Sequence, residues 1–190
     1  VNNLNTARYA GGGAGTTTAG LYASGVASGG VDKHETESWN GTNWTEVNDV
    51  NDDRNGLENQ GVGTQSAAMI FGGYDDAANA VNSCETWNGT NWTEVNNVNT
   101  ARGYGGASGS SSEALFYGGD SGSNTGATES WNGTNWTETG DLSSARQGIM
   151  CAGTLNTAAL GISGYTSTYT AVVEEFTGAG AGQTKTFTDS

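Results

Sequence analysis

The stretch WNGTNWTE stands at residues 39–46 and recurs without a change at 87–94 and 131–138. The three copies begin 48 and then 44 positions apart. An Asn-Gly step accepts the positive φ that a tight hairpin needs, so the residues between the two tryptophans predict a turn. Each indole can bury on the order of 200 Å² of surface. The stretch therefore predicts a β-hairpin whose two tryptophans pack against a neighbouring copy of the same unit.

Other residues recur in step with this hairpin. An Arg opens each unit, and a Glu stands two positions before the first aromatic residue. A fourth copy is eroded, with Phe in place of both tryptophans. Because every Arg is matched by a Glu, we expect a structural pair in each unit; the alternative is a ring of arginines that reads an anionic ligand. The structural repeat anchors are Arg8, Arg54, Arg102, Arg146, Glu37, Glu85, Glu129, Glu174, Trp39, Trp44, Trp87, Trp92, Trp131, Trp136, Phe176 and Phe187.

These anchors divide the chain into four units of a single domain, 1–190. The units are 1–46, 47–94, 95–138 and 139–190. Gly, Asn, Thr and Ser dominate the composition, and all four are poor residues for a helix interior. Each unit instead predicts four short strands separated by turn residues. In the second unit we expect these strands at 54–62, 65–71, 81–87 and 92–96.

A period near 50 residues with four strands per unit is typical of Kelch repeats. The second unit and the start of the third contain MIFGG, CETW, NWTE and NTAR, in the order in which a Kelch blade carries its glycine doublet, its two aromatic residues and its arginine. The whole chain resembles this family, although Trp replaces the usual Tyr, the turn between the aromatic residues is short, and two doublets are Ser-Gly. The resemblance implies an all-β, four-bladed β-propeller of four-stranded antiparallel blades. The repeats also resemble those of marine bacteriophage tail or adhesion proteins.

The chain begins and ends at the same phase of the repeat. We therefore expect each blade to form from contiguous strands, Val1 and Ser190 to lie close together, and the protein to be a monomer. Two other arrangements stay open: two chains that join into eight blades, or a larger propeller of which this chain is part. No cofactor is expected, although the channel of a four-bladed ring could hold a cation through backbone carbonyls, as in other four-bladed propellers.

The net charge of the chain indicates which classes of partner it is expected to avoid. Twenty acidic and six Lys or Arg residues give a net charge of −14. Such a field repels phosphate, so we expect neither nucleic acid nor membrane as a partner. No apolar stretch approaches the roughly 18 residues of a membrane span, and no signal peptide is expected.

Catalytic groups are scarce. The chain has one histidine, no Cys or His spacing for a metal and no recognisable nucleophile set, so we expect no enzyme and no metal site. A sialidase-like hydrolase, with a Tyr nucleophile and an arginine cluster, is the catalytic alternative.

The loops after the second strand of each unit differ most between the repeats, whereas the hairpins are nearly invariant. Variable loops on a fixed frame are typical of a recognition module. We expect a non-catalytic binding module, such as a phage tail or cell-surface adhesin that recognises glycan or protein, with an extracellular or virion-associated location. The alternative is a structural or assembly domain without a ligand. The candidate ligand contacts are Asp32, His34, Tyr74, Asp75, Asp76, Asp120, Tyr165 and Tyr169.

Overall fold

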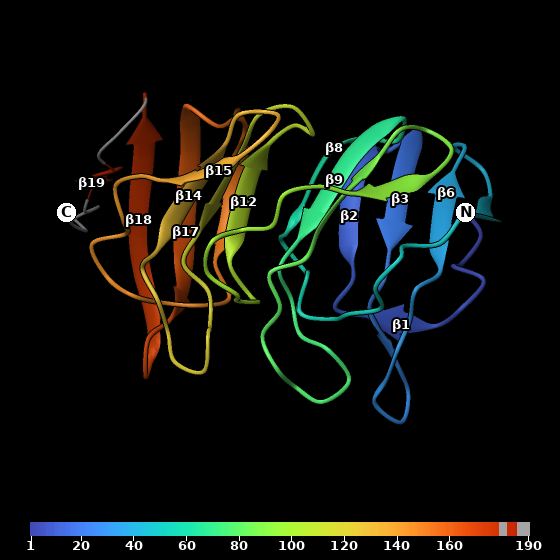
Figure 1. Ribbon diagram of the computed structural model, residues 1–190, viewed down its shortest axis with the longest axis horizontal. Helices are drawn as coiled ribbons and strands as arrows, with labels where there is room; N and C mark the ends of the chain where they lie inside the picture. The colour runs from blue at the N-terminus through green and yellow to red at the C-terminus, as the bar shows by residue number, and fades with distance from the viewer. Residues whose placement is uncertain (179–181, 186–190) are drawn as a thin grey trace.

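The computed structural model describes residues 1–178 and the strand at 182–185. These residues contain no helix; they form four four-stranded antiparallel sheets and one small three-stranded sheet (Figure 1). We call the four larger sheets sheets 1 to 4 in chain order. Each is an up-and-down meander in which consecutive strands are neighbours.

The strands have the following bounds. Sheet 1 contains β2 (Gly12–Thr16), β3 (Ala19–Ala23), β6 (Thr36–Trp39) and β7 (Trp44–Val47). Sheet 2 contains β8 (Gly61–Thr64), β9 (Ala67–Phe71), β10 (Cys84–Trp87) and β11 (Trp92–Glu94). Sheet 3 contains β12 (Gly106–Gly109), β13 (Ala114–Tyr117), β14 (Thr128–Trp131) and β15 (Trp136–Glu138). Sheet 4 contains β16 (Met150–Leu155), β17 (Ala158–Tyr165), β18 (Tyr169–Thr177) and β19 (Gly182–Lys185). The small sheet contains β1 (Arg8–Tyr9), β4 (Val26–Ala27) and β5 (Val31–Asp32).

The first strand predicted for the second unit, at 54–62, is wrong in its bounds, because β8 covers only Gly61–Thr64. The residues before it pair with other segments instead. Asn55 exchanges backbone hydrogen bonds with Tyr74, and the Leu57 amide donates to the Ala10 carbonyl of the preceding unit at 3.0 Å. The other three strands lie where expected but are shorter.

The repeated hairpin forms for a local reason. The Asn40 side-chain oxygen accepts hydrogen bonds from the backbone amides of Thr42 and Asn43, both at 2.9 Å. Gly41 has a φ of +91°, a conformation that costs glycine little. The same contacts recur at Asn88 and Asn132. The sequence of the turn thus sets the same hairpin three times.

Apolar clusters hold successive sheets together. The first contains Leu21 of sheet 1 with Trp87 and Trp92 of sheet 2. The second contains Met69 and Phe71 of sheet 2 with Trp131 and Trp136 of sheet 3. The third contains Tyr117 of sheet 3 with Phe176 of sheet 4, whose rings lie 5.2 Å apart. Each cluster therefore joins one face of a sheet to the aromatic pair, or to its Phe replacement, in the next sheet.

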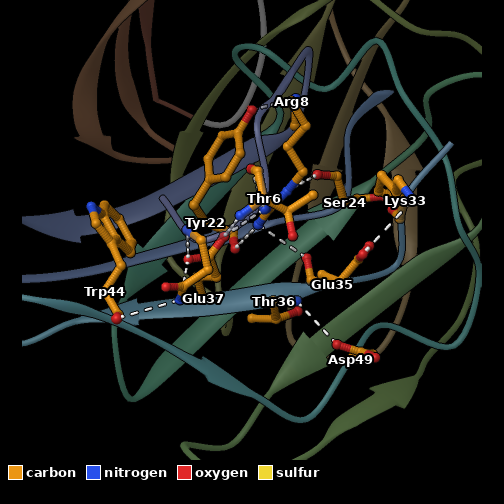
Figure 2. A network of polar contacts seen from close by, with 12 residues as sticks. Thr6, Arg8, Tyr22, Ser24, Lys33, Glu35, Thr36, Glu37, Trp44 and Asp49 are labelled. Carbon is orange, nitrogen blue, oxygen red and sulfur yellow. Dashed lines mark hydrogen bonds and ion pairs between the residues drawn. The ribbon is translucent and has the colours of Figure 1, made fainter. Parts of the chain in front are cut away.

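Every repeat arginine is buried against the glutamate of its own unit. The Nη1–Oε1 distances are 2.6 Å for Arg8–Glu37, 2.8 Å for Arg54–Glu85, and 2.5 Å for both Arg102–Glu129 and Arg146–Glu174. Figure 2 shows the first pair, with Arg8 beside the ring of Tyr22 and Glu37 below it. None of these side chains is more than 1% exposed. The buried pairs brace the segment that enters each unit against the third strand of its sheet.

The Glu37 carboxylate links this packing to pH. Burial would raise the pKa of Glu37, but hydrogen bonds from Asn5, Arg8 and Thr6 outweigh it and hold the pKa below the ordinary value of 4.5. A depressed folded-state pKa contributes stability above the unfolded value, and that stability is lost as pH falls through the folded value.

We therefore expect unfolding to become easier as the pH falls below about 4.5. Glu37→Gln should be less stable than the parent at pH 7 and should lose less stability on acidification. Thermal unfolding followed by circular dichroism from pH 7 to pH 3 measures both effects. The exposed Glu46→Gln is the matched control; a Glu37→Gln profile parallel to that of the parent would contradict the assignment.

Phe187 and the predicted closeness of Val1 and Ser190 lie outside the described residues. In Figure 1 the third strands of sheets 1 and 4, β6 and β18, lie towards opposite ends of the long axis.

Candidate functional site

The variable loops gather at one end of the four sheets. The repeated hairpins lie at the opposite end, because each third strand runs from the loops to a hairpin. The small sheet lies at the loop end, at the bottom of Figure 1. Isolated bridges continue its pattern in the other units, between Asn55 and Tyr74, between Gly103 and Asp120, and between Gln147 and Tyr165.

A cleft of about 320 Å³ opens at this loop end and is lined by Tyr104, Gln147, Gly148, Tyr165 and Tyr169. The Tyr169 side chain is 90% exposed and Tyr165 is 40% exposed. Their rings meet at 5.5 Å between centroids in an edge-to-face arrangement. The backbone amide of Gly148 donates to the Tyr104 carbonyl at 2.7 Å, which holds the two sides of the cleft together. The cleft thus presents three tyrosine rings to solvent.

Polar contacts fix one wall of this tyrosine cleft. The Gln147 amide nitrogen donates to Asp120 Oδ2 at 3.0 Å, and Asp120 Oδ1 accepts from the Gly122 amide at 2.7 Å. This bond uses one of the two N–H donors of the Gln147 side chain and fixes its orientation, and the side-chain oxygen is the group that can accept from a ligand hydroxyl. Asn124 Nδ2 donates to the Tyr165 carbonyl at 2.9 Å and holds the neighbouring loop.

Tyr74 supports the cleft from behind. Its ring lies 5.2 Å from the ring of Tyr104, and its hydroxyl donates to the Asp120 carbonyl at 2.8 Å. Burial raises the pKa of Tyr74, and the Asp120 charge and Tyr104 raise it further. Burial also raises the pKa of Tyr104. Both phenols therefore stay protonated and can act as hydrogen-bond donors at physiological pH.

The other acidic candidates, Asp32, Asp75 and Asp76, form a separate group where the small sheet meets the loop after β9. The Asp32 amide donates to Asp76 Oδ1 at 3.0 Å, and Asp32 Oδ1 accepts from Asn55 Nδ2 at 2.8 Å. Burial raises the pKa of Asp32, and the charge of Asp76 adds to this effect. Asp75 accepts from the backbone amides of Ala77 and Asn79 and so closes its own loop.

No three His, Cys, Asp or Glu side chains in the described part of the chain gather closely enough to hold a metal ion. His34 stands apart from both groups, with a 58% exposed side chain and Nε2 at 3.6 Å from Asp49 Oδ2. No helix long and apolar enough to cross a membrane occurs among the described residues.

The structure thus brings Tyr74, Asp120, Tyr165 and Tyr169 together and leaves the other four candidate contacts elsewhere. Sequence reasoning missed Tyr104 and Gln147. A signal for Tyr104 existed: it stands two positions after the repeat arginine, where the other units have Ala10, Gly56 and Gly148. A large aromatic residue at an otherwise small position indicates a local role. Gln147 gave no such signal, because its position varies in every unit.

A scan of the chain against models of known protein families finds no match, and a search of curated proteins finds none either.

Proposed function

We propose that the four sheets are blades of a Kelch-like β-propeller and that the chain is a non-catalytic glycan-binding module of a virion or cell surface. The observation that carries the binding function is the tyrosine cleft, whose rings are exposed without any partner in the described residues that would cover Tyr169. A purely structural or assembly domain gives no reason for a 90% exposed tyrosine at the mouth of a cleft. The propeller resemblance and the single loop-bearing end support the same assignment.

Sugar chemistry fits this cleft. A pyranose ring offers a C–H face that packs on an aromatic ring and hydroxyls that need polar partners. Tyr165 and Tyr169 supply faces and edges of rings, and Gln147 supplies an acceptor. A concave site with several aromatic side chains and a few fixed polar groups is typical of small-ligand sites. One or two sugar units would fill about 320 Å³.

The charges favour a neutral glycan. The net charge is −14, and the Asp120 carboxylate stands beside Gln147. Anionic sugars would be repelled by this field. The four repeat arginines, which a sialidase-like hydrolase would need in its site, are buried and paired with glutamates. A neutral ligand and no hydrolysis are therefore the expectations for this cleft.

We expect Tyr169→Ala to weaken glycan binding by about tenfold or more, because an exposed aromatic contact is lost without disturbing the fold. A glycan array with neutral and sialylated members identifies the ligand, and titration calorimetry measures the affinity of parent and variant.

The matched control is Tyr9→Ala. Tyr9 is 67% exposed at the same end of the molecule but does not line the cleft. This variant should bind like the parent. An array on which the parent binds no neutral glycan, or an equal loss in both variants, would refute the proposal.

A further inference from the structure

The contact between successive sheets repeats with a fixed register. Each sheet has a forward face, which points to the next sheet in the chain, and a backward face, which points to the previous one. The second strand places Leu21, Met69, Leu115 and Leu160 at equivalent forward positions, opposite Ser38, Thr86, Ser130 and Glu175 of the third strand. The first three side chains belong to the clusters between sheets. The forward face of sheet 4 carries the same kind of residue, and no following sheet occurs among the described residues.

Exposure shows that this last face is uncovered. Leu21, Met69 and Leu115 are 4%, 0% and 3% exposed, whereas Leu160 is 37% exposed. Met150 pairs with Ile162 on the same face and is 56% exposed, and its Sδ accepts a hydrogen bond from Asn59 Nδ2 of the second unit at 3.9 Å. The forward face of sheet 4 therefore offers an apolar surface that its counterparts bury.

The backward face of sheet 1 shows the complementary feature. Trp39 and Trp44 lie 5.5 Å apart at 42°, the geometry of Trp131 and Trp136, and Trp87 and Trp92 differ from it only slightly. Trp92 and Trp136 are each 6% exposed against the preceding sheet, whereas Trp44 is only half-buried. Leu4 is likewise half-buried, although its counterparts Val50, Val98 and Leu142 are buried. Trp39 is itself only 8% exposed, so Trp44 is the member of this preformed pair that sheet 1 leaves partly uncovered, with no preceding sheet packed on it among the described residues.

Backbone hydrogen bonds mark the same break. Gly25 donates to the Arg54 carbonyl, Gly73 to Arg102 and Gly119 to Arg146, at 2.9, 2.9 and 2.8 Å. The next member of this series would join Gly164 to Arg8, and no such bond exists among the described residues. A cavity of about 560 Å³ runs along the first strands of all four sheets, where Val62 of β8 and Ala107 of β12 line it together with Trp44 of sheet 1 and Cys151 of β16. Leu160 does not line this cavity; it lines a smaller one of about 280 Å³ with Ala152 and Glu175, and Gly153 of β16 lines both.

We propose that the forward face of sheet 4 docks on the backward face of sheet 1 in a second copy of this chain, so that two chains complete one ring of eight sheets. The contact continues the interface that already occurs three times within the chain, with Leu160 and Ile162 against Trp39 and Trp44. A head-to-tail contact between identical chains forms a closed ring when the rotation that relates neighbouring chains adds up to a full turn. Each chain here supplies one sheet 1 face and one sheet 4 face. Two chains therefore make two identical contacts, which close the ring. Because each chain carries a charge of −14, the two copies repel each other at low salt, and screening favours the dimer.

Light scattering coupled to size-exclusion chromatography tests this proposal, over a range of protein concentrations and at low and high salt. The wild-type chain should change from monomer to dimer as concentration or salt rises. Leu160→Glu and Trp44→Glu should each remain monomeric, because each variant loses one half of both contacts. A mixture of the two should recover a dimer, since one intact contact forms between the unaltered sheet 1 of the first variant and the unaltered sheet 4 of the second.

Two further variants control for the added charge and for misfolding. Val31→Glu places the same charge on an apolar side chain that is 53% exposed in the small sheet, and it should dimerise like the wild type. Met150→Glu repeats the disruption of the sheet 4 face at a more exposed position, in case Leu160→Glu does not fold. A wild-type chain that stays monomeric throughout, open polymers in place of a dimer, or a variant mixture that stays monomeric would each overturn the proposal. If the wild-type chain stays monomeric and a dissolved fluorescence quencher does not reach Trp44, the ring closes within one chain.

Discussion

Replacing Arg102 with Met is expected to lower the free energy of unfolding by about 3–5 kcal/mol, because it leaves the buried Glu129 carboxylate without its cation. The Arg102 side chain is fully buried. Its guanidinium binds Glu129 at 2.5 Å and donates to the carbonyls of Thr100, Phe116 and Gly118. It also lies 3.8 Å from the centroid of the Phe116 ring. Burial lowers the pKa of Arg102, and Glu129 opposes this shift.

Changing Glu129 as well separates the cost of the unpaired charge from the cost of the lost packing. In the double variant Arg102→Met, Glu129→Gln, no uncompensated charge remains, and the single carbonyl oxygen of Gln can still accept from the Asn99 backbone amide and side chain, which both bind Oε2 of Glu129. We expect the double variant to be more stable than Arg102→Met alone. Urea denaturation of the parent, both single variants and the double variant gives the coupling energy.

Lys33→Met is the control for a surface cation. Lys33 Nζ lies 3.9 Å from Glu35, and both side chains are partly exposed, so the loss should be about 0–1 kcal/mol. Equal losses for Lys33→Met and Arg102→Met would show that the repeat pairs do not brace the units.

The repeat made much of this architecture predictable, because a contact that recurs once per unit leaves a periodic trace in the sequence. The turn at Asn40 and Gly41, the tryptophan pairs and the Arg and Glu of each unit all repeat at fixed offsets. The structure places each tryptophan pair together and each arginine on the glutamate of its unit.

Contacts that occur in only one unit produce no repeated pattern in the sequence and could not be predicted from it. Gln60 is fully buried; its amide nitrogen donates to the Phe71 carbonyl at 2.8 Å, and its oxygen accepts from the Gly105 amide at 3.1 Å. Gln65 reaches the Trp39 carbonyl and Ser38 of the preceding sheet. Neither glutamine recurs in step with the repeat, so nothing in the sequence distinguished it from a solvated loop residue.

The residues of the tyrosine cleft were only partly predictable from the sequence. Tyr165 and Tyr169 were candidates because they stand in a variable loop, and Tyr104 was not, because it follows an arginine of the fixed frame. Only the folded chain shows that Gly148 and Tyr104 are joined by a backbone hydrogen bond across two units. A binding site assembled from different units requires the spatial order of the sheets, which no single repeat contains.

Trp92→Ala is expected to lower the free energy of unfolding by about 3–5 kcal/mol, the cost of removing a large buried aromatic side chain. Trp92 is 6% exposed in the cluster between sheets 1 and 2, and its indole nitrogen donates to Thr36 Oγ1 at 3.0 Å. The substitution removes packing from two sheets and leaves a cavity that the rigid strands cannot close.

Trp44→Ala changes the same position of the repeat in sheet 1, on which no preceding sheet packs in the part of the chain that the structure describes. Because Trp44 is already half-buried, a monomer should lose only on the order of 1 kcal/mol. Thermal unfolding of both variants at low and high protein concentration separates the two contributions. The deficit of Trp92→Ala should not depend on concentration, since its partners belong to the same chain. The deficit of Trp44→Ala should grow with concentration if a second chain covers it, because mass action stabilises only the parent dimer. A Trp44→Ala deficit as large as that of Trp92→Ala, and constant with concentration, would instead place the missing neighbour of sheet 1 within the same chain.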